Sequence, residues 1–277
     1  MTFRVLPIQS AQNVRFKQAL RLRQSRQRRR SERILIDGQR EILCAIDAGV
    51  QVHELFVPAT AVEAVDSGQA PHDFVALLAR LASGGAELLS LPDGLLERIS
   101  YGGRTDQWLA TATPPDRTLA DLRLSDQPMV AILEGVEKPG NLGAVVRSAD
   151  GAGVEAVIVV DGGTDLYNPN AIRASRGTIF TLPVVSAATN QVQAWLRQQG
   201  VTTLVARPNA AVPYDQVDFR QPVALVLGSE ALGVSSAWLG DDYSGICLPM
   251  RGRADSLNVS ITAAILFYEA QRQRNRE

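Results

Sequence analysis

The sequence predicts an α/β protein of two domains, and two features of the chain carry this prediction. Short apolar runs of buried-strand type alternate with helical stretches along most of the 277 residues. The alternation breaks once, in the proline-rich and charged stretch "PPDRTLADLRLSDQP". Because such breaks mark linkers, we expect a first domain at 1–112, a linker at 113–127 and a second domain at 128–277.

The first domain is expected to alternate strands and helices after a basic segment. "RILIDG", "VHELFVP", "AELLSLP" and "QWLATATP" have the composition of strands, and "QREILCAIDAG", "HDFVALLARLASGG" and "DGLLERIS" that of helices. Glycines end the first two of these helices. About a hundred residues of this pattern predict a small α/β domain.

The second domain is expected to contain a parallel sheet. Its apolar runs are "MVAILEGV", "AVIVVDGG", "LPVV", "TTLVARP", "VALVLGSE" and "GICLPM", and we expect helices at 142–152, 190–199 and 257–274. Continuously apolar strands that alternate with helices are typical of a parallel sheet covered on both faces.

Composition excludes several classes of protein. The apolar fraction of 45% is ordinary for a globular protein, and no run approaches the length of a membrane-spanning helix. Cys44 and Cys247 are far apart and form no CxxC, and the two histidines, His53 and His72, are too few for a histidine-built centre. We therefore expect a cytoplasmic protein without a structural metal or a membrane partner.

Positive charge is concentrated at the start of the chain. The net charge is −1, yet the first 33 residues hold ten Arg or Lys and one acid, a local balance of +9. A basic arm on an acidic body indicates a polyanionic partner, although a solvated helix face has the same composition. Dense runs such as "RLRQSRQRRRSER" commonly bind nucleic acid. The candidate contacts are Arg21, Arg23, Arg26, Arg28, Arg29 and Arg30.

Polar residues follow three strands of the second domain. Asn141 and Arg147 lie in "NLGAVVRSADGAG", Glu230 lies in "SEALGVSS", and Ser256 and Asn258 lie in the loop after "GICLPM". Each has a structural alternative, because Asn and Ser cap helices and an acid is favoured in a helix's first turn. Ligands bind at the carboxyl ends of the strands in open α/β sheets, so three polar ends together indicate a binding site.

A dinucleotide site of the Rossmann type is the obvious competitor. It requires G-x-G-x-x-G between the first strand and its helix. The sequence has "GVEKPGNLGAVVRSADG" there, with glycines at other spacings, and "DGGTD" after a later strand also lacks the pattern. The sequence therefore disfavours a nicotinamide-dependent oxidoreductase.

Three segments of the second domain resemble the motifs of the SPOUT superfamily of RNA methyltransferases, in its TrmH-type (SpoU) branch. They are "NLGAVVRSADGAG", "LVLGSEALGVS" and "ICLPMRGRADSLNVSITAAILFYEA", in family order, and "NPNAIRASRGTIFTLPV" resembles the segment between the first two. The resemblance covers Met129 to the end of the sequence. The first domain more weakly resembles the ribosomal-protein-like substrate-binding domain that is often fused to it, as in thiostrepton-type resistance enzymes.

The resemblance implies a fold, a cofactor and an assembly that residue spacing alone does not show. The second domain would carry a deep trefoil knot, an exception to the usual unknotted rule. S-adenosylmethionine would bind in the knot, mainly through backbone groups at Gly228, Leu248 and Leu257. Glycine at 228 would let the backbone approach the ligand closely. The family dimerises through helices beside the knot, so a homodimer is expected.

The resemblance also implies methyl transfer to a ribose 2′-hydroxyl, with Arg147 as the central catalytic residue. Because a guanidinium stays protonated, Arg147 is a poor general base, and we expect it to clamp the adjacent phosphate in a bidentate fork. Glu230 would hold Arg147 or brace the first loop. Asn141, Ser256 and Asn258 would fix loop geometry and bond the ribose or the cofactor's carboxylate.

Further arginines are candidate RNA contacts. Arg173 and Arg176, in "AIRASRG", are the best of these, with ordinary surface positions as the alternative, and Arg251 and Arg253 border the last loop. Together with the N-terminal arginines they would neutralise phosphates, which gives affinity but little sequence information. A-form RNA is recognised by its shape and by exposed loops, so base choice is expected to rest with the first domain.

Two functions from different classes follow. The first is an S-adenosylmethionine-dependent ribose 2′-O-methyltransferase acting on ribosomal RNA, with transfer RNA as the other substrate considered. The second is a non-catalytic RNA-binding protein of the same fold. The joint presence of the five polar residues favours the enzyme, and the additional first domain favours ribosomal RNA. DNA is not an expected partner.

Overall fold

The computed structural model describes residues 5–103, 108–161, 164–229 and 232–275. The chain forms two compact units. Unit 1 contains Met1–Pro115 and Tyr167–Thr181, and unit 2 contains Asp116–Leu166 and Leu182–Glu277. The chain therefore passes between the units three times, whereas the sequence suggested a single linker.

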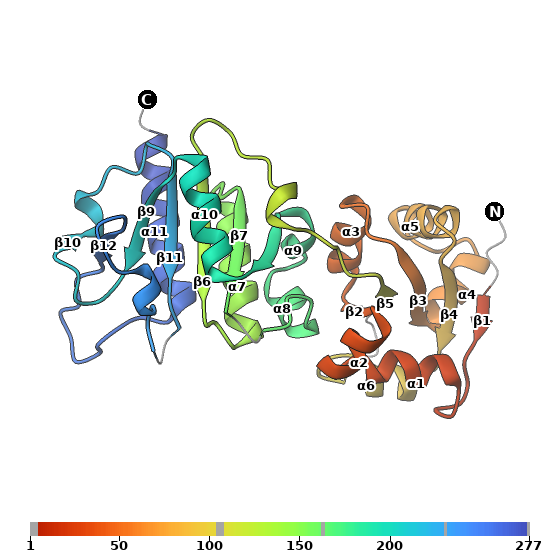
Figure 1. Cartoon of the computed structure of the whole chain (residues 1–277). Helices are drawn as coiled ribbons and strands as arrows, with labels where there is room; N and C mark the ends of the chain where they lie inside the picture. The colour runs from red at the N-terminus through yellow and green to blue at the C-terminus, as the bar shows by residue number, and fades with distance from the viewer. Residues whose placement is uncertain (1–4, 104–107, 162–163, 230–231, 276–277) are drawn as a thin grey trace. The chain divides into compact units, whose positions relative to one another are not determined.

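Unit 1 is built on a mixed five-stranded sheet with the order β1-β4-β3-β5-β2 (Figure 1). Neighbours β1, β4 and β3 are parallel, and β5 runs antiparallel to both β3 and β2. The strands are β1 (Val5–Pro7), β2 (Ile34–Asp37), β3 (Val52–Pro58), β4 (Glu87–Leu91) and β5 (Leu109–Ala112). The helices are α1 (Val14–Arg21), α2 (Ser25–Ser31), α3 (Gln39–Asp47), α4 (Ala59–Asp66), α5 (His72–Ser83), α6 (Asp93–Ile99), α8 (Pro169–Ala174) and α9 (Thr178–Thr181).

Local sequence explains how α1 joins the core of this unit. Asn13 caps the helix, because its side chain accepts hydrogen bonds from the backbone N–H groups of Arg15 and Phe16. Phe16 and Ala19, one turn apart, are fully buried and pack with Phe56 of β3 and with residues of β4 and α6. The basic segment is therefore an amphipathic, folded part of unit 1.

The segment Tyr167–Thr181 packs within unit 1, although it lies between strands of unit 2 in the sequence. Its helix α8 contacts β2, and α9 contacts α3. Gly177 is buried with φ +85°, and an added Cβ would lie 2.8 Å from the Cβ of Cys44. Only glycine permits so close an approach in this conformation. The guanidinium of Arg173 stacks on the ring of Tyr101, 4.1 Å from its centroid.

Unit 2 contains a seven-stranded sheet in which every neighbouring pair is parallel, so the predicted parallel sheet is confirmed. Its order is β10-β12-β9-β11-β6-β7-β8. Every residue of the central strands β6, β7 and β11 is buried, as continuously apolar runs predict. The strands are β6 (Met129–Glu134), β7 (Ala156–Val160), β8 (Val184–Ala187), β9 (Thr202–Ala206), β10 (Val212–Pro213), β11 (Val223–Leu227) and β12 (Ser244–Cys247).

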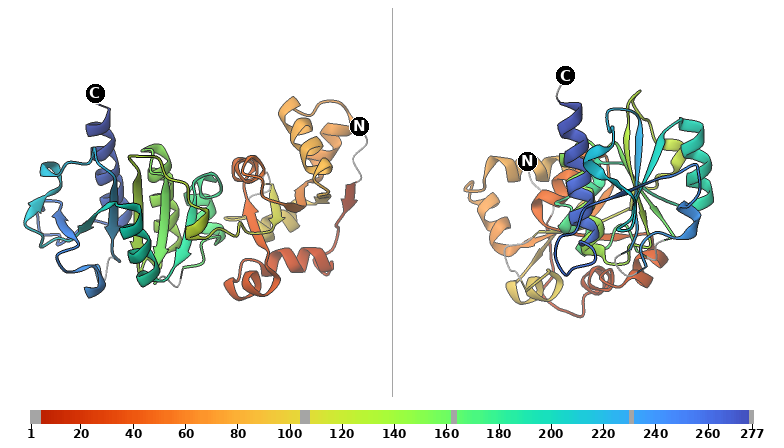
Figure 2. Two further views of the ribbon diagram at one scale, coloured as in Figure 1. Left: turned by 45° about the horizontal axis from the view of Figure 1, so that its top comes forward. Right: turned by 90° about the vertical axis from the view of Figure 1, so that its left-hand side faces the viewer.

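Helices cover both faces of this sheet. The α-helices are α7 (Pro139–Gly151), α10 (Thr189–Gln199) and α11 (Val259–Arg274), and short 3₁₀ turns lie at Leu119–Asp121, Tyr214–Gln216 and Ser236–Trp238. Helix α7 packs against α11, and the right-hand view of Figure 2 shows α11 and α10 on opposite sides of the sheet. In the part of the chain that the structure describes, no helix is both long enough and apolar enough to span a membrane.

Candidate active site

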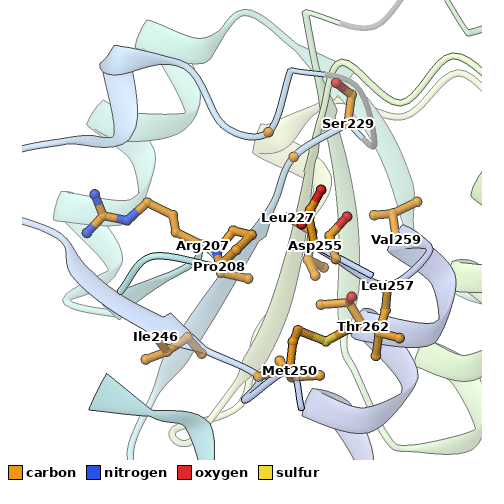
Figure 3. Close-up of a pocket in the computed structure, with 15 residues that line it drawn as sticks. Arg207, Pro208, Leu227, Ser229, Ile246, Met250, Asp255, Leu257, Val259 and Thr262 are labelled. Atoms are coloured by element: carbon orange, nitrogen blue, oxygen red, sulfur yellow. The ribbon is translucent and has the colours of Figure 1, made fainter. Parts of the chain in front are cut away.

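A cavity of about 170 Å³ lies where three adjacent strands of unit 2 end (Figure 3). Strands β12, β9 and β11 are neighbours, and the residues that follow each of them line the cavity together with the start of α11. Four residues predicted from the sequence are among the lining residues: Gly228, Leu248, Ser256 and Leu257. The parallel sheet therefore brings these four residues together, although Gly228 and Leu257 are 29 positions apart in the chain.

Gly228 is required by its own loop. A Cβ at this position would lie 2.1 Å from the backbone carbon of Gly233 and 2.4 Å from the backbone nitrogen of Val234. The loop folds back through a hydrogen bond from the Gly233 N–H to the Ser229 carbonyl, at 2.9 Å. From the family resemblance, glycine was expected at this position because it lets the backbone approach a ligand closely. The structure shows that the Cβ direction is filled by the loop itself, while the residue still lines the cavity.

The cavity has apolar walls beside a loop whose main chain makes no hydrogen bond to other backbone groups in the described residues. Within the described residues, no hydrogen bond joins the backbone of residues 249–256 to another backbone group. Side chains of Leu227, Leu257 and Val259 form apolar surface, and Asp255 adds a carboxylate (Figure 3). Backbone N–H and C=O groups form hydrogen bonds when they are buried, so a bound ligand would pair with those of this loop. A ligand with a flat apolar body and a hydrogen-bonding edge would fit both the walls and the loop.

Asn141 and Asn258 lie next to each other, although 117 positions separate them. The Asn258 amide nitrogen donates to the Asn141 side-chain oxygen at 3.4 Å. Asn258 also caps α11, because its side-chain oxygen accepts from the Ser260 N–H at 2.9 Å and the Ser260 hydroxyl at 2.6 Å. Helix α7 begins at Pro139, so Asn141 is not a cap. The sequence offered Asn141 and Ser256 as helix caps, and neither is one, because Lys138 precedes α7 as its N-cap residue and Asn258 caps α11.

Of Arg147 and Glu230, the structure describes only Arg147. Arg147 lies on α7 with an exposed side chain, and it does not line the cavity. It forms no hydrogen bond or ion pair with any residue that the structure describes, so its guanidinium is available to a partner. Glu230 lies outside the described residues.

Sequence reasoning missed Glu134, the last residue of β6. Its carboxylate is 5% exposed and accepts hydrogen bonds from the Ser235 N–H at 2.6 Å, the Ser235 hydroxyl at 2.7 Å and the Trp238 indole N–H at 3.0 Å. These bonds tie the end of β6 to the segment that follows the Gly228 loop. The signal was present, because Glu134 is itself a polar residue at the carboxyl end of a strand.

Sequence reasoning also missed Arg207, a second polar residue at the carboxyl end of a strand, because it directly follows β9. It is one of the lining residues of the cavity, and Figure 3 shows its guanidinium pointing away from the other labelled residues. The guanidinium lies against Gly245, where an added Cβ would be 2.2 Å from its Nη2 atom. Arg207 therefore packs on the neighbouring strand β12.

The structure also sorts the predicted RNA-binding arginines of unit 1. Arg28 is only 4% exposed and donates to the Leu22 carbonyl at 2.5 Å, so it holds α2 in place and cannot reach an RNA. That prediction is wrong, because charge density does not show which side chains the fold buries. Arg23 lies 3.8 Å from the buried carboxylate of Asp37. The side chains of Arg21, Arg26, Arg29 and Arg30 are exposed.

The other predicted arginine contacts differ in their surroundings. Arg173 is half-buried on Tyr101, as described above, whereas Arg176 is exposed with φ 56° and its carbonyl accepts from the Cys44 thiol at 3.8 Å. Arg251 and Arg253 are exposed in the loop between β12 and α11.

Comparison with known proteins agrees with this architecture. Residues 128–268 match the SpoU rRNA Methylase family, and residues 13–110 match the MRM3-like substrate binding domain. The sequence is 28% identical over 261 residues to the 23S rRNA (guanosine(2553)-2′-O)-methyltransferase RlmP of Bacillus subtilis (strain 168), which covers 94% of this chain and 97% of that protein.

Solved structures give the same result. An RNA 2′-O ribose methyltransferase superposes with a TM-score of 0.80 at 37% identity, covering 98% of this chain and all of that one. The AdoMet-bound rRNA methyltransferase from Sinorhizobium meliloti superposes with a TM-score of 0.84 at 26% identity, covering 97% and 98%. This chain therefore belongs to the SpoU rRNA methylase family, and it is a methyltransferase with a substrate-binding domain at its N-terminal side.

Proposed function

We propose that this protein transfers the methyl group of S-adenosylmethionine to a ribose 2′-hydroxyl of ribosomal RNA. The observation that carries the proposal is the cavity at the ends of β9, β11 and β12, which gathers Gly228, Leu248, Ser256 and Leu257. Relatives of matching length are named as 23S rRNA 2′-O-methyltransferases, and one related structure holds AdoMet. These similarities support both the cofactor and the substrate class.

The cavity residues fit S-adenosylmethionine chemically. The apolar side chains of Leu227 and Leu257 suit the faces of an adenine, and the unpaired main chain of residues 249–256 suits its hydrogen-bonding edge. The Asp255 carboxylate is placed to accept from ribose hydroxyls or from the ammonium group of the methionine part. When bound, the cofactor supplies an electrophilic methyl group on a sulfonium.

Arg147 is proposed to orient the acceptor ribose. Its planar, permanently charged guanidinium suits a bidentate grip on the adjacent phosphate. In the transfer, the sulfonium–methyl bond breaks as the oxygen–methyl bond forms, and the hydroxyl proton leaves to the phosphate or to water. Asn141 and Asn258 would hold α7 and α11 at the distance this geometry needs, and Glu230 would brace Arg147. Positioning of reacting groups supplies a large share of such rates.

The proposal extends to assembly and location. Ile261 and Tyr268 are half-exposed apolar side chains two turns apart on α11, which supports a homodimer formed through this helix. The trefoil knot and a cytoplasmic location are part of the same proposal: the knot follows from the family resemblance, and the location from the composition of the sequence.

The direct test is transfer of labelled methyl from S-adenosylmethionine to protein-free ribosomal RNA and, separately, to bulk transfer RNA. Primer-extension stops then map any 2′-O-methyl group. We expect label at one ribose of ribosomal RNA. Label in transfer RNA alone would mean that the substrate is transfer RNA and not ribosomal RNA. Cofactor binding without label in either RNA would indicate that the substrate is an assembled ribosomal particle. Absence of both label and cofactor binding would leave a non-catalytic RNA-binding protein.

A further inference from the structure

Unit 1 contains a second hollow, of about 670 Å³, that is separate from the cavity described above. Its lining comes from two sources. Helices α1 and α2 and the turn before β2 supply arginines, among them Arg21, Arg30 and Arg33. Strands β3, β4 and β5 supply acids and hydroxyls, among them Glu54, Glu87 and Thr111. The hollow therefore has a cationic wall of helices and an acidic wall of strands.

The cationic wall is made of arginines that the fold does not use. The side chains of Arg21, Arg30 and Arg33 form no hydrogen bond or ion pair with the described residues. In the same basic segment, Arg15 bonds both carboxylate oxygens of Glu87 at 2.5 and 3.1 Å, and Arg28 is buried on a carbonyl. Within this segment some arginines therefore stabilise the fold and others line the hollow.

The acidic wall depends on a β-bulge. The pairing of β3 with β5 shifts register between Val52 and Glu54, so His53 is the extra residue. Neighbouring residues of a regular strand face opposite sides, but here both His53 and Glu54 line the hollow. Bulges re-aim side chains in this way and are common next to functional sites.

Hydrogen bonds hold these two side chains in place. The Thr111 hydroxyl donates to Glu54 at 2.8 Å, which leaves the other carboxylate oxygen of Glu54 4.0 Å from the Arg15 guanidinium. His53 Nε2 lies 2.8 Å from the Thr113 hydroxyl. Partial burial, together with the nearby charge of Arg33, lowers the pKa of His53, which favours the neutral imidazole. The wall therefore offers a carboxylate and an imidazole ring at fixed positions.

We propose that this hollow binds one nucleotide extruded from a single-stranded loop of the substrate RNA. The phosphates would contact Arg21, Arg30 and Arg33, and the base edge would donate to Glu54. Guanine fits best, because its N1–H and N2 amino group lie side by side and match one carboxylate. Splayed-out loop bases are the usual targets of sequence-specific RNA recognition. The inference rests on the proposed RNA substrate and deepens it, since it assigns the base-reading site.

Binding assays test the phosphate wall without requiring methyl transfer. The probes are a fluorescein-labelled hairpin RNA with an open guanosine-containing loop and a blunt duplex of the same stem. The full-length protein should prefer the hairpin. Arg21→Gln/Arg30→Gln should weaken hairpin binding about tenfold and lower the slope of log K on log salt by about 1.4, roughly 0.7 for each lost single-strand phosphate contact.

A matched control removes the same charge elsewhere on unit 1. Arg40 is exposed on α3, and Arg80 pairs with Asp47 at 2.7 Å on the surface, so Arg40→Gln/Arg80→Gln should keep the preference for the hairpin. Two outcomes would contradict the proposal that the hollow binds a nucleotide of the RNA. One is an equal loss of hairpin affinity in the two double variants, and the other is equal wild-type affinity for hairpin and duplex. If the wild-type protein binds neither RNA, the proposed substrate fails instead.

The base-reading wall has its own test. Replacing the loop guanosine by inosine removes only the N2 amino group, and we expect the wild-type protein to lose about tenfold in affinity. Glu54→Gln should bind both loops alike while keeping the wild-type salt slope. Thermal unfolding of each variant checks that unit 1 stays folded. A wild-type protein that binds inosine and guanosine loops equally would overturn the assignment of Glu54.

Discussion

The cavity of unit 2 and the hollow of unit 1 are lined by different kinds of groups. The cavity of unit 2 is walled by apolar side chains and by main chain that lacks backbone partners, with Asp255 as its acid. The hollow of unit 1 is walled by charged side chains, with three arginines facing two glutamates. Binding of a ligand by main-chain groups depends on the shape of the backbone. Binding of RNA phosphates by arginine side chains depends on the release of counterions. Ligand binding in the cavity of unit 2 should therefore respond to changes of glycine and of loop packing. Ligand binding in the hollow of unit 1 should respond to salt and to changes of charge.

The largest effect should come from Arg147, which belongs to neither hollow. Arg147→Ala is expected to lower the methyl-transfer rate about 100-fold, because a misplaced acceptor ribose loses that much. Affinity for S-adenosylmethionine, measured by calorimetry, should not change. Arg147→Lys should recover little, since a point charge cannot form the bidentate fork. Transfer at nearly the wild-type rate by Arg147→Ala would remove this residue from the mechanism.

Gly228→Ala should damage the main-chain site selectively. The added Cβ meets the backbone of Gly233 at 2.1 Å, so the loop must move at a cost of about 1–3 kcal/mol. Cofactor affinity should fall about tenfold to 100-fold, while RNA binding by unit 1 is retained. Gly94→Ala is the control, because a Cβ there meets nothing within 4 Å. Unchanged cofactor affinity in Gly228→Ala would separate this loop from the cofactor.

Glu134→Gln probes the support behind that loop. All three groups bonded to Glu134 are donors, so an amide NH₂ would face a donor and leave a buried bond unmade, at about 1–3 kcal/mol. We expect cofactor affinity to fall about tenfold at a temperature where the protein is fully folded. The exposed Glu137→Gln is the matched control. A lower unfolding midpoint with unchanged affinity would mean that Glu134 only stabilises the fold.

The smallest effect concerns pH, and it separates the two units. Both histidines lie in unit 1, and the pKa of His53 is lowered by burial and by Arg33. Because the folded state favours neutral His53, this residue should not reduce the free energy of unfolding at pH values above its ordinary pKa of 6.5. As the pH falls below 6.5, His53 is protonated more readily in the unfolded state, and the free energy of unfolding should decrease. Chemical unfolding followed at pH 5 to 8 should show the loss, and His53→Gln should abolish it. A pH-dependent loss that persists in His53→Gln would contradict this assignment.

Much of unit 2 was predictable because its signals are local or periodic. Six apolar runs and three helical stretches were located from composition. The rule that strand ends form the site predicted Ser256, and the family resemblance added Gly228, Leu248 and Leu257. The cap of α11 was predicted wrongly: Ser256 was expected there, although Asn258 is equally suited by residue type. The backbone decided in favour of Asn258.

The sequence by itself determined the parallel sheet, the basic segment and the motif residues of the candidate active site. Each depends on short-range patterns: continuous apolar runs, charge density and polar residues after strands. Tertiary structure alone decided that Arg28 is buried while Arg21, Arg30 and Arg33 face a hollow, and that Tyr167–Thr181 packs within unit 1. These outcomes depend on contacts between segments far apart in the chain, such as Gly177 against Cys44, and no local pattern encodes them.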